Sequence, residues 1–280
     1  LEREFLGANP PAEHCALLRR LSLDLTGLPQ TPAELTAFET RYGSDPDTAV
    51  IEAVDRLLAS PHYGERMALT WLDAARYADS NGFQQDGNRH QWPWRDWVVR
   101  AYQNNLPFDR FTVEQIAGDL LPEPTQDQRI ATAFNRNHML NGEGGAIAEE
   151  QRINNVLDRV DTTATTWLAL TMACAQCHSH KYDPISHEEY FQFFAFFNNL
   201  PESGVVDYRS GQGCAFGSGA TVQLARPWLT LPTPEQEAEK KHLEQEIKTL
   251  GETLATLETE IAPARQAWES KFTAKELEDR

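Results

Sequence analysis

Long apolar runs are missing from this sequence. No run approaches the roughly 18 consecutive apolar residues that a membrane-spanning helix needs. No secretory leader is visible either, and the chain begins at Leu1 instead of Met. We interpret the chain as a fragment or a processed protein that does not itself span a membrane.

Positive charge is also scarce. The chain has 25 Lys and Arg residues against 42 Asp and Glu residues, so its formal net charge is −17. An acidic surface repels phosphate backbones and anionic lipid headgroups. This excludes general nucleic-acid binding, although a local basic patch can still exist.

Strand patterns are few, and helical periodicity dominates. Apolar residues make up 40% of the chain, with seven Trp and thirteen Phe, enough for a real core. We therefore predict a mainly α, irregular multi-helix domain with the best strand candidate around residues 204–230. The predicted helices cover residues 11–26, 31–43, 47–60, 63–77, 94–104, 126–136, 149–170 and 187–198.

Local signals fix some of these helix ends. Thr31 followed by Pro32 and Glu34 predicts a helix start with a capping box, in which two side chains satisfy free backbone amides. Gly27 and Pro29 predict the end of the first helix. The sequence alone therefore places this boundary between two helices.

Three segments are expected. Residues 1–202 form the helical domain, and residues 203–234, rich in Gly, Ser and Pro, read as a linker or irregular crossing segment. Residues 235–280 form a helical arm. Its apolar residues alternate in steps of four and three from Leu243 to Ile261, the seam of a coiled coil, until Pro263 interrupts it.

The segment TMACAQCHSHKYDP carries the clearest chemical motif. Cys174 and Cys177 are two residues apart and His178 follows directly, the Cys-x-x-Cys-His pattern of covalent haem c attachment. Two thiols on one turn can bind both porphyrin vinyl groups, and the His then ligates the iron. Zinc is the alternative metal, with His180 as a fourth ligand, although no second Cys pair is present. A redox dithiol is a third possibility, without the βαβ context it needs.

Several longer strings resemble one known family. These include LLASPHYGERMALTWLDAARYADSNGFQQDG, WPWRDWVVRAY, IATAFNRNHMLNGEGG, NNVLDRVDTTATTWLALTMACAQCHSHKYDPIS and YFQFFAFFNN. In this order they resemble the planctomycete-type cytochrome c-like domain, the second of the two cytochrome-like families of large planctomycete proteins. The resemblance covers residues 12–202 and, more loosely, the helical arm.

This resemblance implies an exported, haem-bearing module of a longer polypeptide, in the periplasm or at the cell surface. Cys174, Cys177 and His178 would hold the haem. The resemblance favours Met139 over His138 as the ligand on the opposite face of the iron, and Met ligation suits electron transfer. Lys181 and Tyr182 offer groups that could orient the histidine or a propionate.

We therefore expect electron transfer through one haem c, with a redox protein or neighbouring domains of the same polypeptide as partner. One alternative is a haem- or metal-dependent enzyme acting on a peroxide or a carbohydrate-type substrate. The other is a structural or interaction module in which the motif binds a metal such as zinc. In an oxidising compartment Cys15 and Cys214 could form a disulfide.

Overall fold

The computed structural model describes residue 10 and residues 12–83, 86–205 and 225–271. Helices dominate these residues, and β-structure is limited to two isolated bridges, between Ser80 and Asn88 and between Asn141 and Val205. The mainly α prediction is confirmed. The strand expected around residues 204–230 is not formed in the described part of that range, and residues 206–224 lie outside the description.

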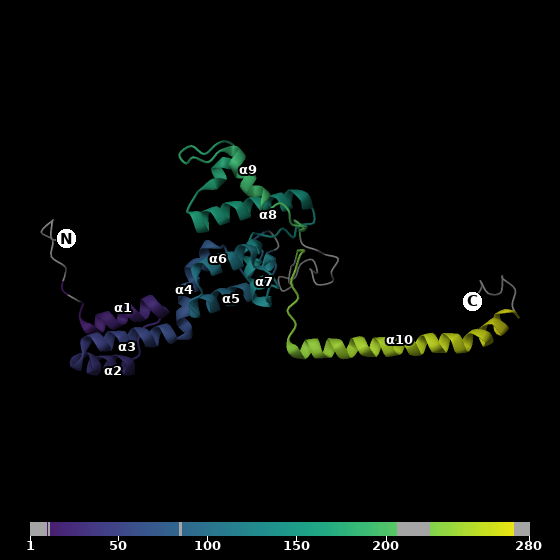
Figure 1. Cartoon of the computed structure of the whole chain (residues 1–280), viewed down its shortest axis with the longest axis horizontal. Helices are drawn as coiled ribbons and strands as arrows, with labels where there is room; N and C mark the ends of the chain where they lie inside the picture. Colours follow the sequence, from purple (N-terminus) through teal and green to yellow (C-terminus); the bar gives the residue numbers. More distant parts are fainter. Residues whose placement is uncertain (1–9, 11, 84–85, 206–224, 272–280) are drawn as a thin grey trace. The chain divides into compact units, whose positions relative to one another are not determined.

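Ten α-helices follow one another along the described chain (Figure 1). They are α1 (His14–Thr26), α2 (Pro32–Ser44), α3 (Pro46–Ala59), α4 (Pro61–Ala74), α5 (Trp92–Gln103), α6 (Phe108–Ala117), α7 (Gln126–Ala131), α8 (Ala148–Thr163), α9 (His187–Ala195) and α10 (Pro234–Glu269). Seven of the first nine helices start within two residues of a predicted start, no predicted range covers α6, and α8 is shorter than the predicted 149–170.

The predicted boundary between the first two helices is present. Gly27 ends α1 with φ 71°, a left-handed conformation that glycine adopts without steric cost. Thr31 caps α2, and its hydroxyl and the Glu34 carboxylate form the reciprocal capping box. Helices α1 to α3 pack on one another around Leu18 and Phe38, and α1 also packs on α4.

An aromatic core joins α4 to α7. Trp94, Trp97 and Phe111 are buried here, and Trp71 packs edge-on against Phe111. Trp167, from the turn after α8, packs edge-on against Trp71 and donates to the hydroxyl of Thr112. The segment that leads from α8 to the cysteine motif is therefore fixed on this core.

Helix α8 ends earlier than its periodicity predicts. It stops at Thr163, and the backbone widens into a π-helical turn over Ala164–Leu168 before Ala169 adopts a left-handed conformation with φ 54°. This wider turn redirects the chain, so that Met172–Gln176, the first part of the motif, begins as a separate 3-10 helix.

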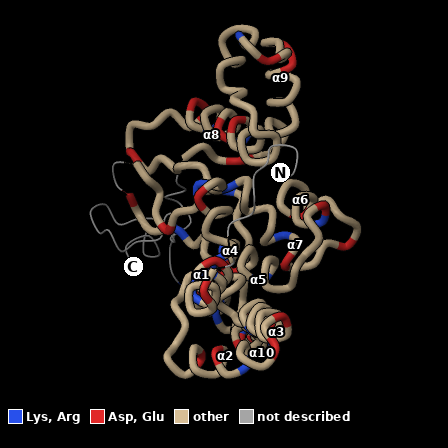
Figure 2. The backbone as a smooth tube through the Cα atoms, turned by 90° about the vertical axis from the view of Figure 1, so that its left-hand side faces the viewer, with Lys and Arg blue, Asp and Glu red and all other residues tan. Residues whose placement is uncertain are grey.

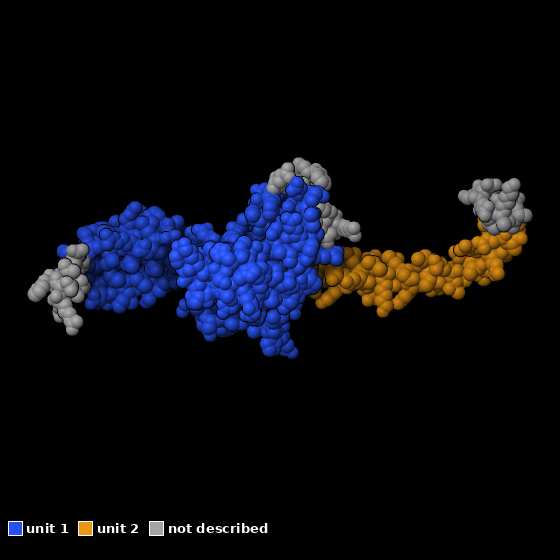
Figure 3. Space-filling view, turned by 90° about the horizontal axis from the view of Figure 1, so that it is seen from above, with its two compact units in different colours: residues 1–228 blue, residues 229–280 orange. Residues whose placement is uncertain are grey.

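The chain divides into two compact units, residues 1–228 and 229–280 (Figure 3). The second unit contains α10, whose side chains are all exposed except that of Glu269, which is half-buried. The prediction that Pro263 interrupts this helix is wrong, because α10 continues to Glu269. Pro263 lies on the water-exposed side, where solvent can bind the carbonyl that loses its amide partner.

Acidic side chains are spread widely over the chain. Figure 2 shows Asp and Glu positions on α2, α3, α8 and α9, so the negative charge is not gathered on one helix. Among the described residues, no helix is both long and apolar enough to cross a membrane.

Candidate functional site

The cysteine motif lies on a short turn that two buried side chains hold against α8 and α9. Ala175 is fully buried and Met172 is 7% exposed, and both pack into an apolar cluster with Val156 and Val160 of α8 and with Tyr190 of α9. The side chains between these two anchors face outward. The motif is thus a rigid turn that presents its polar groups to solvent.

Both motif thiols are free. Cys174 and Cys177 are exposed and unbridged, and they flank the buried Ala175 and the half-buried Gln176. Exposed thiols are accessible to a ligand that approaches from solvent. This arrangement is compatible with thioether formation and equally with metal binding.

His178 is oriented by a backbone hydrogen bond. Its Nδ1 lies 2.8 Å from the carbonyl oxygen of Ser179. A carbonyl can only accept, so Nδ1 carries the proton and donates, which leaves the Nε2 lone pair of the neutral ring free. Metal-bound histidines are commonly held in this way, by a hydrogen bond from the nitrogen opposite the metal. His178 is also exposed, so Nε2 is accessible.

His180 stabilises the loop after the motif through hydrogen bonds to the backbone. Its Nδ1 accepts from the backbone amide of Asp183 at 2.9 Å and from that of Tyr182 at 3.3 Å. Nε2 lies 3.4 Å from the hydroxyl of Thr171. Since Nδ1 accepts two amides, it is unprotonated, and the Asp183 carboxylate 3.2 Å away forms no ion pair with this tautomer. His180 holds the loop after the motif closed and is no free ligand.

A second histidine supports the turn from α9. His187 donates from Nε2 to the carbonyl of Gln176 at 3.0 Å, and its ring packs edge-on against Phe191. Tyr190, one turn along α9, lies near Cys177 and donates to Asp161 of α8 at 3.4 Å. Burial raises the pKa of the Asp161 carboxyl to about 6. The motif therefore rests on both α8 and α9.

Lys181 and Tyr182 form a pair with each other. The Lys181 ammonium nitrogen lies 5.2 Å from the centre of the Tyr182 ring, and Tyr182 is 82% exposed. The described contacts join neither side chain to His178. Lys181 and Tyr182 lie within four residues of His178 in the chain, but they do not orient its side chain.

Met139 lies in another part of the domain. Its sulfur would be 3.1 Å from a Cβ atom added to Gly82, so the Met139 side chain covers this glycine, and it is 55% exposed. Among the described contacts, none joins Met139 to Cys174, Cys177 or His178. The structure brings together the three motif residues but does not bring Met139 to them.

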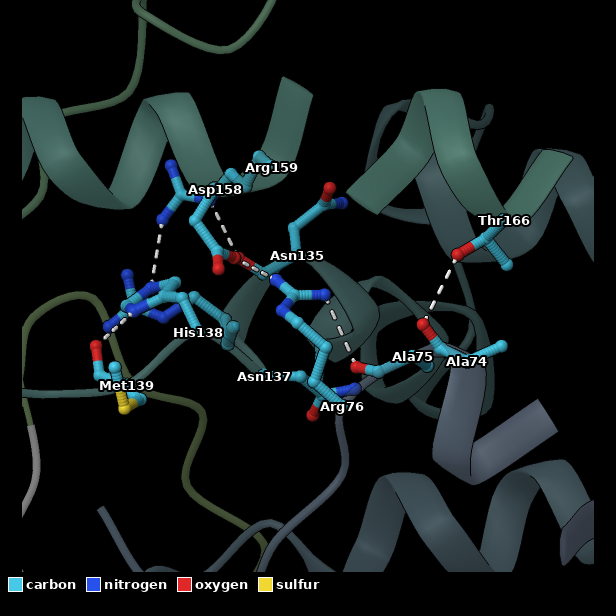
Figure 4. A network of polar contacts seen from close by, with 12 residues as sticks. Ala74, Ala75, Arg76, Asn135, Asn137, His138, Met139, Asp158, Arg159 and Thr166 are labelled. Atoms are coloured by element: carbon cyan, nitrogen blue, oxygen red, sulfur yellow. Dashed lines mark hydrogen bonds and ion pairs between the residues drawn. The ribbon is translucent and has the colours of Figure 1, made fainter. Parts of the chain in front are cut away.

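His138, the alternative distal residue, is buried and fully engaged. Its Nδ1 donates to the Met139 carbonyl at 2.8 Å, so the unprotonated Nε2 accepts from Arg159 at 3.2 Å (Figure 4). Burial, followed by the charges of Arg136 and Arg159, holds the pKa of His138 well below its usual value. His138 is therefore a neutral acceptor for an arginine and has no free nitrogen for iron.

A group of four arginines, of which Arg159 is buried and the other three are half-buried, lies around His138 and the neighbouring part of α8. We call it the arginine cluster, and it consists of Arg76, Arg89, Arg136 and Arg159. The Glu202 side chain, fully buried, binds Arg159 through both carboxylate oxygens and binds Arg136 at 3.0 Å. Arg76 binds Asp158 of α8 (Figure 4). None of these arginines was singled out from the sequence.

Glycine makes one of these contacts possible. A Cβ atom at Gly204 would collide with the backbone of Ala148 and Arg152 at the start of α8. Because the chain passes this closely, Glu202 reaches the face of α8 that carries Arg159. The sequence segments that contain these arginines can be recognised, but the spacing between the segments does not indicate that the arginines contact one another.

A third group could hold a metal by proximity alone. Glu13, His14 and Cys15 lie together at the start of α1. The hydrogen bond from Cys15 to Glu39 raises the pKa of the thiol to about 12, so this sulfur is a poor ligand at neutral pH. Cys15 is free, and Cys214, with which it could pair in an oxidising compartment, lies outside the described residues.

The donor set of the motif fits a c-type haem. Two free thiols on one turn and a histidine with an open Nε2 match what covalent attachment and axial ligation need. The set does not exclude zinc, which would take the same three donors and one more.

A family comparison covers most of the chain. Residues 1–202 match the model of the PSCyt2 family, described as a protein of unknown function (DUF1549), so the chain belongs to this family. The family name supports a cytochrome-like domain. Comparisons with curated proteins and with solved structures gave no match.

Proposed function

We propose that this domain carries one covalently attached haem c and transfers single electrons. Cys174 and Cys177 would form the two thioethers, and His178 would bind the iron through Nε2. The observation that carries this proposal is the hydrogen bond from His178 Nδ1 to the Ser179 carbonyl, because it leaves Nε2 as the free nitrogen. The bound haem would supply the redox couple.

The residues of the chain would hold and orient this group. The buried Ala175 and the His187 contact to Gln176 keep the turn rigid, so both thiols and His178 stay on one short segment. Lys181 and Tyr182 lie close enough in the chain to contact the haem edge. Met139 stays the candidate for the second axial position from the family resemblance, although the described contacts place it against Gly82.

Covalent haem attachment takes place outside the cytoplasm, so this proposal includes an extracytoplasmic location. The electron partner would be another redox protein or a neighbouring domain of the same polypeptide. An exposed motif supports this, because electrons can pass to a partner that docks on the same surface.

The test is a pyridine haemochrome spectrum of the protein co-expressed with a haem c maturation system. We expect the α-band of a c-type haem, retained in denaturant, and its loss in a Cys174→Ala, Cys177→Ala variant. Cys15→Ala is the matched control, because this thiol lies on α1 and is bound to Glu39. Absence of covalent haem in the unmodified protein would refute the proposal.

Two further measurements separate the alternatives. Rapid binding of carbon monoxide to the reduced protein would show an open iron position and favour an enzyme that acts on a peroxide or a carbohydrate-type substrate. If no haem is attached and the purified protein holds zinc instead, lost together with Cys174 and Cys177, the motif serves a structural or interaction module.

A further inference from the structure

The arginine cluster has more positive than negative charge. Among the described residues, four guanidinium groups face two carboxylates, those of Asp158 and Glu202, which leaves an excess of two positive charges beside a neutral histidine. An excess of charge of one sign is costly where the groups are largely withdrawn from water. It is also unexpected in a chain whose formal net charge is −17.

Arg89 carries much of this excess. Its two terminal nitrogens donate to the carbonyls of His138, at 2.6 Å, and of Arg136. Within the described part of the chain, no carboxylate forms an ion pair with it. Burial, and then the nearby Arg76, lower the pKa of Arg89 to about 10. Asp158 opposes this fall in pKa only in part, so among the described residues Arg89 has no ion-pair partner of its own.

Two buried donors of this region have no acceptor among the described residues. Nδ2 of Asn137 and Nε of Arg76 lack a hydrogen-bond partner, and Asn137 is only 4% exposed. Asn137 lies between the two residues whose carbonyls bind Arg89, and its Oδ1 is taken by Gln91 at 2.9 Å. Buried donors without acceptors are rare, and here both occur beside excess positive charge.

Arg76 adds backbone strain to this pattern. It follows α4 with φ 59°, at the position of the helix C-cap motif that glycine usually occupies. The amides of Arg76 and Tyr77 bind back to Asp73 and Leu72, as this motif requires. An arginine in a strained position that glycine would fill without cost suggests a use for its side chain.

Solvent can reach the edge of the arginine cluster. The side chains of Arg76, Arg136 and Asp158 are 26%, 22% and 35% exposed. Arg159, in contrast, is fully buried by Glu202 and His138. A small group could therefore approach Arg76 and Arg136 without opening the core.

We propose that the arginine cluster binds an oxyanion, a carboxylate, sulfate or phosphate group of a ligand. Such a group supplies the missing negative charge and the missing acceptors together, and guanidinium groups bind it through paired hydrogen bonds. A neutral ligand would supply only the acceptors. This site does not depend on the haem, because the described contacts join none of its arginines to the cysteine motif.

The test is isothermal titration of the 280-residue chain with inorganic phosphate, sulfate and acetate at constant ionic strength. Sodium chloride is the reference salt. We expect saturable binding of at least one of the three at millimolar concentration, and the order among them identifies the group. The same titration is run on the Cys174→Ala, Cys177→Ala variant, which cannot attach haem, and on the haem-loaded protein. Binding by the variant but not by the haem-loaded protein would mean that a haem propionate occupies the site when haem is present.

Two variants test the assignment of residues. Arg89→Gln should weaken anion binding by at least about tenfold, whereas Arg100→Gln, which removes a surface charge paired with Asp127, should not change it. Asn137→Asp places a carboxylate among the guanidiniums. It should raise the melting temperature and abolish anion binding.

Three outcomes would overturn the proposal. The first is that none of the three anions binds more tightly than chloride, in which case water satisfies the free donors. The second is equal loss of binding in Arg89→Gln and Arg100→Gln. The third is an Asn137→Asp variant that still binds the anion, and this variant remains informative if Arg89→Gln fails to fold.

Discussion

The cysteine motif and the arginine cluster differ in almost every structural respect. The motif comes from one short segment, and its reactive groups, Cys174, Cys177 and His178, are exposed. The cluster comes from four separate segments, Glu202 adds a fifth, and the ion pair between Arg159 and Glu202 is fully buried. Chemistry that resides in one segment can be recognised from sequence, whereas chemistry that depends on packing becomes visible only in the fold.

The largest expected effect comes from breaking the buried ion pair. Glu202→Gln leaves Arg136 and Arg159 without their shared counter-ion, and loss of one partner of a buried pair costs about 3–5 kcal/mol of unfolding free energy. Urea unfolding measures this loss. The control is Glu149→Gln, which removes a carboxylate that is 70% exposed and pairs with Arg152, and it should change the unfolding free energy by less than about 1 kcal/mol. An equal loss of unfolding free energy in both variants would mean that the ion pairs of Glu202 contribute no more to stability than an exposed carboxylate does.

The next effect concerns the loop behind the motif. His180→Ala removes the acceptor of the Tyr182 and Asp183 amides, which should cost about 1–2 kcal/mol. Hydrogen exchange should show faster exchange of these two amides. Tyr182→Ala is the control, since the Tyr182 ring is 82% exposed. Unchanged protection in His180→Ala would show that the loop is held by other contacts.

Asp161 lies between the two regions and gives a pH-dependent effect. Its carboxyl has a pKa of about 6, raised mainly by burial and also by Asp158, while the bond from Tyr190 opposes the rise. The folded state thus binds the Asp161 proton more tightly than the unfolded state. This contribution to stability is present at low pH and is lost as pH rises through about 6.

Asp161→Asn should therefore stabilise the protein at pH 8 by about 1 kcal/mol, a value reduced for the partial exposure of the group. The gain should disappear at pH 4. Thermal melts at the two pH values measure it, and Asp73→Asn, on the exposed surface of α4, is the control. Stabilisation of the same size at both pH values would mean that the titration of Asp161 is not its cause.

The smallest expected effect is at Met139. Because this side chain is 55% exposed, Met139→Leu should change the unfolding free energy by less than about 0.5 kcal/mol. In haem-loaded protein the same variant tests the second axial position. A large fall of the reduction potential would show that Met139 binds the iron, and an unchanged potential would exclude it.

The helices could largely be predicted because their signals are local. Gly27 and the Thr31 capping box lie within a few residues of the boundary that they define. The end of α8 could not be predicted in this way. Apolar periodicity continues past Thr163, but Trp167 is needed in the aromatic core, and the π-helical turn brings it there.

The candidate sites also differ in whether their signals are local in the sequence. The identity of Cys174, Cys177 and His178 follows from their spacing, but the hydrogen bond that orients His178 depends on the backbone turn. The neutral state of His138 depends on arginines up to about fifty positions away in the chain, such as Arg89, whose guanidinium reaches its carbonyl. No periodicity encodes such contacts.

Helix α8 has one face in each region. Val156 and Val160 pack beneath the motif turn, whereas Asp158 and Arg159 belong to the charge network. Thermodynamic linkage makes any coupling through this helix reciprocal. If an anion at the cluster shifted the redox equilibrium at the motif, oxidation or reduction there would change the anion affinity by the same factor. A potentiometric titration with and without the anion would then report on both sites at once.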